Sequence, residues 1–240
     1  MRLRAEPGRP LRIGHRGAMA LAAENTLTSL EYALAAAVDL VEFDVIRLEG
    51  ELVLAHSPAE RAPCAPGLAE ALRFLSDRAD ASVGFMVDLK APGYEREVVE
   101  ALRRAEVLDR SLVSSAYGAS VRAVRAAEPR LATGLAYPHD RYGLNRRLPQ
   151  RTIITGLEVL RRLLPLRIEW MLRRARADVA VLNWLLVTPG LVTRCHRAGR
   201  AVFAWTVERP DVAAALLDAG VDGLVVNDPG ILDDPGRFHS

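Results

Sequence analysis

The sequence is poor in cysteine, in long hydrophobic runs and in net charge, and each shortage excludes a class of protein. The two cysteines, Cys64 and Cys195, are far apart in the chain, so neither a zinc cluster nor a disulfide framework is indicated. No uncharged apolar stretch is long enough to span a membrane, and residues 1–10 lack the apolar run of a secretory signal. A net charge of +2 gives no reason to expect nucleic acid as a partner. We therefore expect a cytoplasmic protein.

Lysine is almost absent. The chain contains 32 basic residues, and Lys90 is the only lysine among them. A lysine ammonium is a compact point charge whereas a guanidinium is planar and larger, so the two are not interchangeable where a small anion is held. The presence of a single lysine in a chain that otherwise uses arginine favours a function for Lys90 that needs a compact cation. Chance retention is the alternative.

The chain is rich in short apolar runs that alternate with helical patterns, which is typical of βα units around a parallel sheet. The expected strands are 11–14, 39–45 with a hairpin extension at 51–55, 83–89, 111–114, 131–135, 178–182, 200–205 and 223–226. The expected helices are 28–37, 68–79, 94–105, 119–127, 189–198 and 210–219. Eight strands with intervening helices predict an α/β fold, a single-domain (β/α)8 TIM barrel over residues 1–240 with its core at about 11–230. An open doubly wound sheet is the competing architecture.

One segment, 141–176, follows the expected fifth strand and differs from the rest of the chain. It contains ten arginines and two acids, and its part 157–172 mixes leucines with arginine pairs around Pro165, which we expect to break the helix. One interpretation is an Arg-rich helical insertion whose apolar face packs on the barrel. The other is an interfacial helix that binds anionic lipid headgroups, which makes the protein a peripheral membrane protein.

Carboxylates stand where expected strands end, which is where a barrel places catalytic groups. Glu42 and Asp44 are two residues apart on a strand, so both side chains point to the same face. Two such carboxylates repel each other unless a cation lies nearby, and Asp88 at the end of the next strand supplies a third oxygen ligand. This donor set predicts one divalent cation, Mg²⁺ or Ca²⁺. Ion pairing of Glu42 and Asp44 with arginines is the alternative.

Two histidines follow apolar runs near these acids. His15 lies in His15-Arg16-Gly17 after the first strand, and His56 follows 52–55. Cleavage of a phosphodiester needs one group that removes a proton from the attacking oxygen and another that protonates the leaving oxygen, and a histidine pair can do both near neutral pH. Arg16 and Lys90 would balance the nonbridging phosphate oxygens. Of the other histidines, His139 could approach the barrel mouth, and we interpret His196 and His239 as ordinary surface or helix residues.

Together these features resemble the glycerophosphodiester phosphodiesterase family. The resemblance rests on motifs that occur in order across about residues 11–230, namely His15-Arg16-Gly17, Glu24-Asn25-Thr26, Glu42-x-Asp44, His56, Asp88-x-Lys90, Trp205-Thr206-Val207 and Gly220-Val221-Asp222-Gly223. As a set they are far more specific than any one of them. The resemblance implies a barrel of the phosphatidylinositol-specific phospholipase type with a divalent metal.

The resemblance also implies roles for individual residues. Glu42, Asp44 and Asp88 correspond to metal ligands, His15 and His56 to the acid-base pair, Arg16 and Lys90 to phosphate contacts, and Trp205 to an apolar wall beside the alcohol portion. Glu24 corresponds to a residue that supports the metal site. Asn25, with Thr26, either supports it too or caps the first helix. Trp205 is equally compatible with a place in the core.

The sequence departs from the family pattern in three ways, and these departures bear on the choice of substrate. The usual Glu-x-Lys is Asp88-x-Lys90, the usual His-Asp is His56-Ser57, and the segment between His56 and the helix at Leu68 is short. This combination is similar to the sphingomyelinase D branch of the superfamily. We expect hydrolysis of a small glycerophosphodiester to glycerol 3-phosphate and an alcohol, with a lysophospholipase D or sphingomyelinase D-like activity as the alternative. A noncatalytic barrel that binds phosphate or membranes is the third hypothesis.

Overall fold

The structure is a computed structural model that describes residues 1, 3–4, 6, 9–139 and 149–233. Eight parallel strands form a closed barrel, because β1 pairs with both β9 and β2 at the ends of the sheet order. The barrel strands are β1 (Leu11–Gly14), β2 (Leu40–Leu48), β4 (Gly84–Leu89), β5 (Ser111–Ser115), β6 (Ala132–Tyr137), β7 (Val179–Asn183), β8 (Ala201–Val207) and β9 (Gly223–Val226). The short β3 (Glu51–Leu54) pairs antiparallel with β2, as the expected hairpin requires. The (β/α)8 prediction is confirmed, and the open sheet is excluded.

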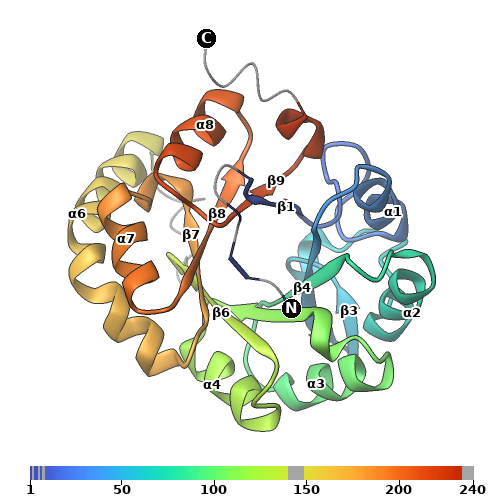
Figure 1. Cartoon of the computed structure of the whole chain (residues 1–240). Coiled ribbons are helices and arrows are strands. Elements are labelled where there is room, and N and C mark those ends of the chain that lie inside the picture. The colour runs from blue at the N-terminus through green and yellow to red at the C-terminus, as the bar shows by residue number, and fades with distance from the viewer. Residues whose placement is uncertain (2, 5, 7–8, 140–148, 234–240) are drawn as a thin grey trace.

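An outer ring of helices surrounds the strands (Figure 1). The described helices are α1 (Leu27–Ala35), α2 (Leu68–Arg78), α3 (Glu95–Arg104), α4 (Gly118–Ala127), α6 (Gln150–Ala175), α7 (Pro189–Arg197) and α8 (Pro210–Asp218). Each expected helix is present, with bounds within two residues of the prediction. Thr26 is the N-cap of α1 and takes part in a capping box with Ser29, so the cap belongs to Thr26 and not to Asn25.

Alternate residues on each strand face the barrel interior. The lower interior is apolar, and Ile13, Leu40, Met86 and Phe203 are among its buried side chains. Two residues further along β1, β2 and β4 the inward positions become polar, at His15, Glu42 and Asp88. Side chains two residues apart on a strand point to the same face. The strand faces that fill the apolar interior therefore also carry these polar groups at the carboxyl ends of the strands.

Near the amino-terminal ends of the strands, Leu3 packs against the interior apolar cluster, and Leu11 lies at the start of β1. The interior is therefore apolar toward this end, and its polar side chains gather at the carboxyl ends of the strands.

Helix α6 corrects one expectation. Pro165 lies inside a continuous helix that runs from Gln150 to Ala175, so it does not end the helix. The buried side chains of Leu164, Ile168 and Leu172 pack on the barrel on both sides of the proline, and this packing holds the two halves in one helix. Of the predicted insertion, residues 141–148 lie outside the described part of the chain.

None of the helices that the structure describes combines the length and the apolar run that crossing a bilayer requires. The cytoplasmic location and the single-domain organisation that the sequence suggests stay predictions.

Candidate active site

A pocket of about 630 Å³ opens at the carboxyl ends of the barrel strands. Its charged side is lined by residues from β1, β2, β4 and the β3 hairpin, namely His15, Arg16, Glu42, His56, Ser57, Glu60, Asp88 and Lys90. The opposite side is lined mainly by apolar and aromatic residues, among them Ala116, Tyr117, Ala136, Pro138, His139, Leu157 and Trp205. The pocket thus divides into a charged wall and an apolar wall.

Glu42 contributes a buried carboxylate to the charged wall. Its side chain is 4% exposed, and its Oε2 accepts a hydrogen bond from the backbone N–H of Arg16 at 2.7 Å. Burial raises the pKa of Glu42 well above its usual value, and the nearby Asp44 carboxylate raises it further. A positive charge close to Glu42 would therefore be strongly favourable.

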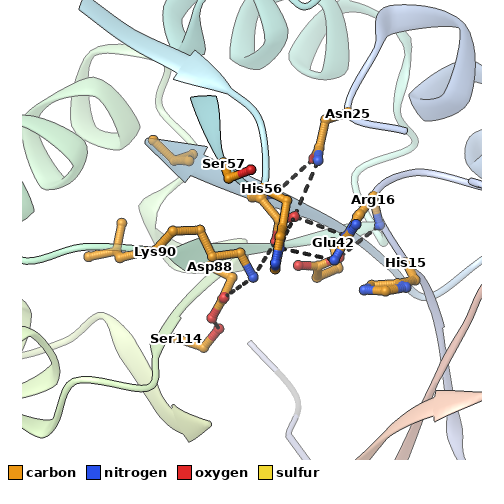
Figure 2. A network of polar contacts seen from close by, with 12 residues as sticks. His15, Arg16, Asn25, Glu42, His56, Ser57, Asp88, Lys90 and Ser114 are labelled. Carbon is orange, nitrogen blue, oxygen red and sulfur yellow. Dashed lines mark hydrogen bonds and ion pairs between the residues drawn. The ribbon is translucent and has the colours of Figure 1, made fainter. Parts of the chain in front are cut away.

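Figure 2 shows the polar network at this end of the barrel, with Arg16, Asn25, His56 and Lys90 among its labelled side chains. Asp44 is fully buried and contacts all four of them. Its Oδ1 lies 2.7 Å from Nζ of Lys90, and its Oδ2 lies 3.0 Å from Nε of Arg16 and 3.2 Å from Nδ1 of His56. Asn25 makes two hydrogen bonds to Asp44. The Asn25 Nδ2 donates to Oδ2 of Asp44 at 3.2 Å, and the Asn25 Oδ1 accepts from the backbone N–H of Asp44 at 2.9 Å. Burial disfavours the Asp44 carboxylate, but Lys90, His56 and Arg16 outweigh it and hold the pKa of Asp44 well below its usual value. Asp44 is therefore ionised.

Lys90 connects the carboxylates of two neighbouring strands. Asp44 and Asp88 lie opposite each other in the parallel register of β2 and β4, and the Lys90 ammonium donates to Asp88 at 2.7 Å while also contacting Asp44. Burial opposes the charge of Lys90, yet Asp44 and then Asp88 raise its pKa above the usual value. The other oxygen of Asp88 accepts from the Ser114 hydroxyl of β5. The lone lysine is thus a fixed positive charge between two acids.

His15 is held by an amide. Its Nδ1 lies 2.6 Å from Oδ1 of Asn227, and the Asn227 Nδ2 donates to Oε1 of Glu208 at 2.6 Å. Because a carboxylate can only accept, the Asn227 amide must turn its oxygen to His15, and Nδ1 must then carry the proton. Burial and, after it, the positive charge of Arg16 lower the pKa of His15 to about 4. At neutral pH the ring is uncharged, with the lone pair on Nε2.

His56 contacts both Arg16 and Asp44. Its Nδ1 is 3.0 Å from an Nη of Arg16 and 3.2 Å from Asp44, so the ring is placed by a cation and an anion together. The neighbouring Ser57, where the family pattern has an acid, donates from its hydroxyl to Oε2 of Glu60 at 2.8 Å. Since Glu60 also lines the pocket, a carboxylate is present at this edge, three residues later in the chain than the family pattern places it.

The loop after β1 positions Arg16. Arg16 and Gly17 both have positive φ, and a Cβ on Gly17 would lie 2.4 Å from the backbone of Ser29, so only glycine fits there. The Ser29 hydroxyl donates to the Arg16 carbonyl at 2.9 Å, which ties the loop to the start of α1. The guanidinium then reaches Glu24 at 2.6 Å as well as Asp44. Burial opposes the Arg16 charge, but Asp44 and Glu42 raise its pKa overall.

The apolar wall is built from the βα loops across the mouth. Trp205, at the end of β8, donates from its indole N–H to the Val181 carbonyl at 3.1 Å, which fixes the ring at the pocket edge. Tyr117 and His139 meet edge to face with ring centroids 4.4 Å apart. His139 therefore lies at the mouth, as the sequence suggested.

Comparison with known sequences now decides the family. The profile of the glycerophosphoryl diester phosphodiesterase family matches residues 15–62 and 55–231, which together include nearly the whole barrel. The chain belongs to this family. The match divides into two segments that overlap at residues 55–62, which include His56 and the start of the connection to α2. The expected resemblance is confirmed, and the chain is a phosphodiester hydrolase by family.

One relative matches this family member in sequence, and two solved structures match it in fold. A glycerophosphodiester phosphodiesterase of Caldanaerobacter subterraneus subsp. tengcongensis is 24% identical over 92% of this chain and 95% of its own. A phosphodiesterase structure from Oleispira antarctica, in complex with its product sn-glycerol-3-phosphate, has a TM-score of 0.71 at 21% identity and covers 93% of this chain and 97% of its own. A glycerophosphodiester phosphodiesterase from Parabacteroides distasonis has a TM-score of 0.73 at 17% identity, with 96% and 97% covered.

The residues present fit a divalent cation in their chemistry. Glu42 and Asp88 line the pocket, and Asp44 is buried beside them on β2. Burial and the neighbouring Asp44 raise the pKa of Glu42, so a cation close to this carboxylate would be favourable. In the arrangement described, the ammonium of Lys90 lies between Asp44 and Asp88, and the described residues contain no group of three His, Cys, Asp or Glu already arranged as a metal site. Of the three candidate ligands, Glu42 is therefore the one whose surroundings most favour a cation.

The structure brings the residues predicted from sequence into one site. His15, Arg16, Glu42, His56, Asp88, Lys90 and Trp205 line the pocket, and Glu24, Asn25 and Asp44 support it from below. Sequence reasoning missed Ser114, Asn227 and Glu208. Ser114 and Asn227 stand at the ends of β5 and β9, so their position at a strand end was a signal available in the sequence. His196 hydrogen-bonds to Asp222 away from the pocket, and His239 lies outside the described residues.

Proposed function

We propose that this chain hydrolyses glycerophosphodiesters to glycerol 3-phosphate and an alcohol, with His15 and His56 as the acid-base pair. The observation that carries the proposal is the pair of histidines that line one pocket, each with its Nδ1 in contact with another side chain of the protein. With Nδ1 engaged, the Nε2 of each ring is the nitrogen left for a substrate proton. Membership of the family and the product-bound relative from Oleispira antarctica support the same reaction.

We assign the role of the base to His15, because its ring is neutral and oriented. Its pKa of about 4 keeps the ring neutral at pH 7, and Asn227 holds the proton on Nδ1. Nε2 then takes a proton from the attacking oxygen, either of water or of a neighbouring substrate hydroxyl that forms a cyclic phosphate first. His56, beside the ionised Asp44, gives a proton to the leaving alcohol oxygen.

The cations of the charged wall, Arg16 and Lys90, would bind the phosphate. Arg16 and Lys90 are held on the carboxylates of this wall, so their charges are fixed before substrate arrives. Glu42, Asp44 and Asp88 would hold a Mg²⁺ or Ca²⁺ ion, which supplies further positive charge to the phosphate oxygens. Glu24 holds Arg16 through a further ion pair.

A lipid diester is the second candidate substrate. The short connection between His56 and α2 and the apolar wall of Tyr117, Leu157 and Trp205 would accept a lysophospholipid. A barrel that only binds phosphate is the non-enzymatic alternative. Binding alone gives no reason for a neutral, oriented His15 opposite His56, so the enzyme is favoured.

A substrate panel tests the proposal. Release of alcohol would be measured from glycerophosphocholine, glycerophosphoethanolamine and lysophosphatidylcholine, each with Mg²⁺, with Ca²⁺ and with a chelator. We expect metal-dependent release of choline or ethanolamine from the first two and little from the third. Faster turnover of lysophosphatidylcholine would replace the proposal by the lipid alternative. Absence of product with either metal would leave only the binding protein.

A further inference from the structure

Helix α6 has apolar side chains on two opposite faces. On one face Leu164, Ile168 and Leu172 are buried against the barrel. On the other lies a stripe of exposed side chains, which we call the α6 stripe, made of Val159, Leu163, Leu166 and Trp170. Packing on the barrel therefore explains the first face and leaves the second without a partner within the described chain.

The α6 stripe is unusual in this molecule. Seven large hydrophobic side chains are exposed in the described part of the chain, and four of them belong to the stripe. Leu166 is 75% exposed and Trp170 is 52% exposed. The spacing of the four residues is four, three and four, so they form one line along the helix, about 16 Å long at 1.5 Å per residue. Scattered exposed leucines are ordinary, whereas a continuous apolar line marks a binding surface.

Arginines flank the α6 stripe on both sides. At 100° per residue, Arg162 and Arg173 fall along one edge and Arg167 and Arg174 along the other, and all four are exposed. The Arg174 guanidinium lies 5.4 Å from the ring centroid of Trp170. The nearby acid Glu169 is paired with Arg194 of α7, so it does not neutralise these edges. The face is an apolar line between two positive rows.

We propose that the α6 stripe docks the protein on the surface of an anionic lipid bilayer. The apolar side chains enter the boundary between headgroups and acyl chains, and the four arginines pair with lipid phosphates on either side. The charge pattern selects this partner. A second copy of the chain would place one arginine edge against another, and like charges at an interface oppose association.

Docking would also place the pocket near the bilayer. Leu157, two residues before Val159 in the N-terminal half of α6, lines the pocket. The α6 stripe therefore starts close to the mouth, and the bound protein would hold its pocket beside the membrane. The proposal does not depend on the hydrolysis of glycerophosphodiesters, because it concerns a surface outside the pocket.

Vesicle sedimentation tests the proposal. Protein would be mixed with phosphatidylcholine vesicles that contain or lack phosphatidylglycerol, at low and at high NaCl. We expect binding only to the anionic vesicles, weakened by salt, and a blue shift of Trp170 fluorescence that is absent in Trp170→Phe. Absence of binding to anionic vesicles at low salt would overturn the proposal.

Variants locate the surface. Leu166→Gln with Trp170→Gln should lower the partition coefficient at least about tenfold, because each loss of a buried apolar side chain exceeds the free energy of a tenfold change. Tyr32→Gln, at a similarly exposed side chain on α1, is the matched control and should bind as the wild type does. Both variants should keep the wild-type Tm and turnover of a soluble diester. Equal binding by the double variant, or a dimer that the double variant abolishes, would contradict docking through this stripe.

Discussion

The two walls of the pocket differ in how their side chains are fixed. On the charged wall, Asp44 alone contacts Arg16, Asn25, His56 and Lys90, so these side chains have little freedom to move. On the apolar wall, the Trp205 ring is held by a hydrogen bond to a backbone carbonyl, and Tyr117 packs edge to face against His139.

This difference has a chemical meaning. Proton transfer and phosphate stabilisation require groups at fixed positions, and a network of charge-assisted hydrogen bonds supplies them. Recognition of an alcohol requires apolar surface of suitable shape and tolerates repacking. We therefore expect substitutions on the charged wall to reduce turnover, and substitutions on the apolar wall to change affinity for the alcohol.

The largest effect is expected at the histidines. His15→Ala and His56→Ala should each fold and each lose a factor of roughly 10² or more in kcat on a glycerophosphodiester, because each removes one partner of the proton transfer. Steady-state kinetics with saturating metal would measure the loss.

A matched control for the histidines is His196→Gln, which changes a histidine that is also paired with a carboxylate but lies away from the pocket. It should keep full turnover. Either active-site variant at near wild-type kcat, with an unchanged Tm, would remove the acid-base assignment and leave the charged wall as a binding surface.

The sequence predicted the charged wall well because its residues follow directly from strand ends and from chain order. Glu42 and Asp44 share a face by the strand period, and Asp88 is adjacent through the β2–β4 register. The bond from Asn227 to His15 joins residues 212 apart in the chain, which no local pattern reveals. The continuation of α6 through Pro165 depends on tertiary packing of Leu164 and Ile168, which overrides the local propensity of proline to end a helix.

An intermediate effect is expected when the lone lysine is replaced. Lys90→Arg keeps the charge but cannot place a compact ammonium 2.7 Å from both Asp44 and Asp88, so the carboxylates and the phosphate contact must shift. We expect kcat/KM to fall by roughly tenfold to a hundredfold, the scale that a displacement of about 1 Å produces. The reverse exchange Arg104→Lys, at a side chain that is 79% exposed, is the control and should be silent. Full activity of Lys90→Arg would show that chance retained the lysine.

The smallest effect is expected on the apolar wall. Trp205→Leu keeps apolar packing at the pocket edge but removes the flat ring, so KM for a glycerophosphodiester with a bulky alcohol should rise about fivefold, or ~1 kcal/mol, while kcat changes little. Trp170→Leu makes the same exchange on α6, outside the pocket, and should leave KM for a soluble diester unchanged. If Trp205→Leu instead lowers kcat and leaves KM unchanged, Trp205 contributes to the reaction step and not to binding of the alcohol. Such a result would mean that Trp205 helps to position the reacting atoms, as the residues of the charged wall do.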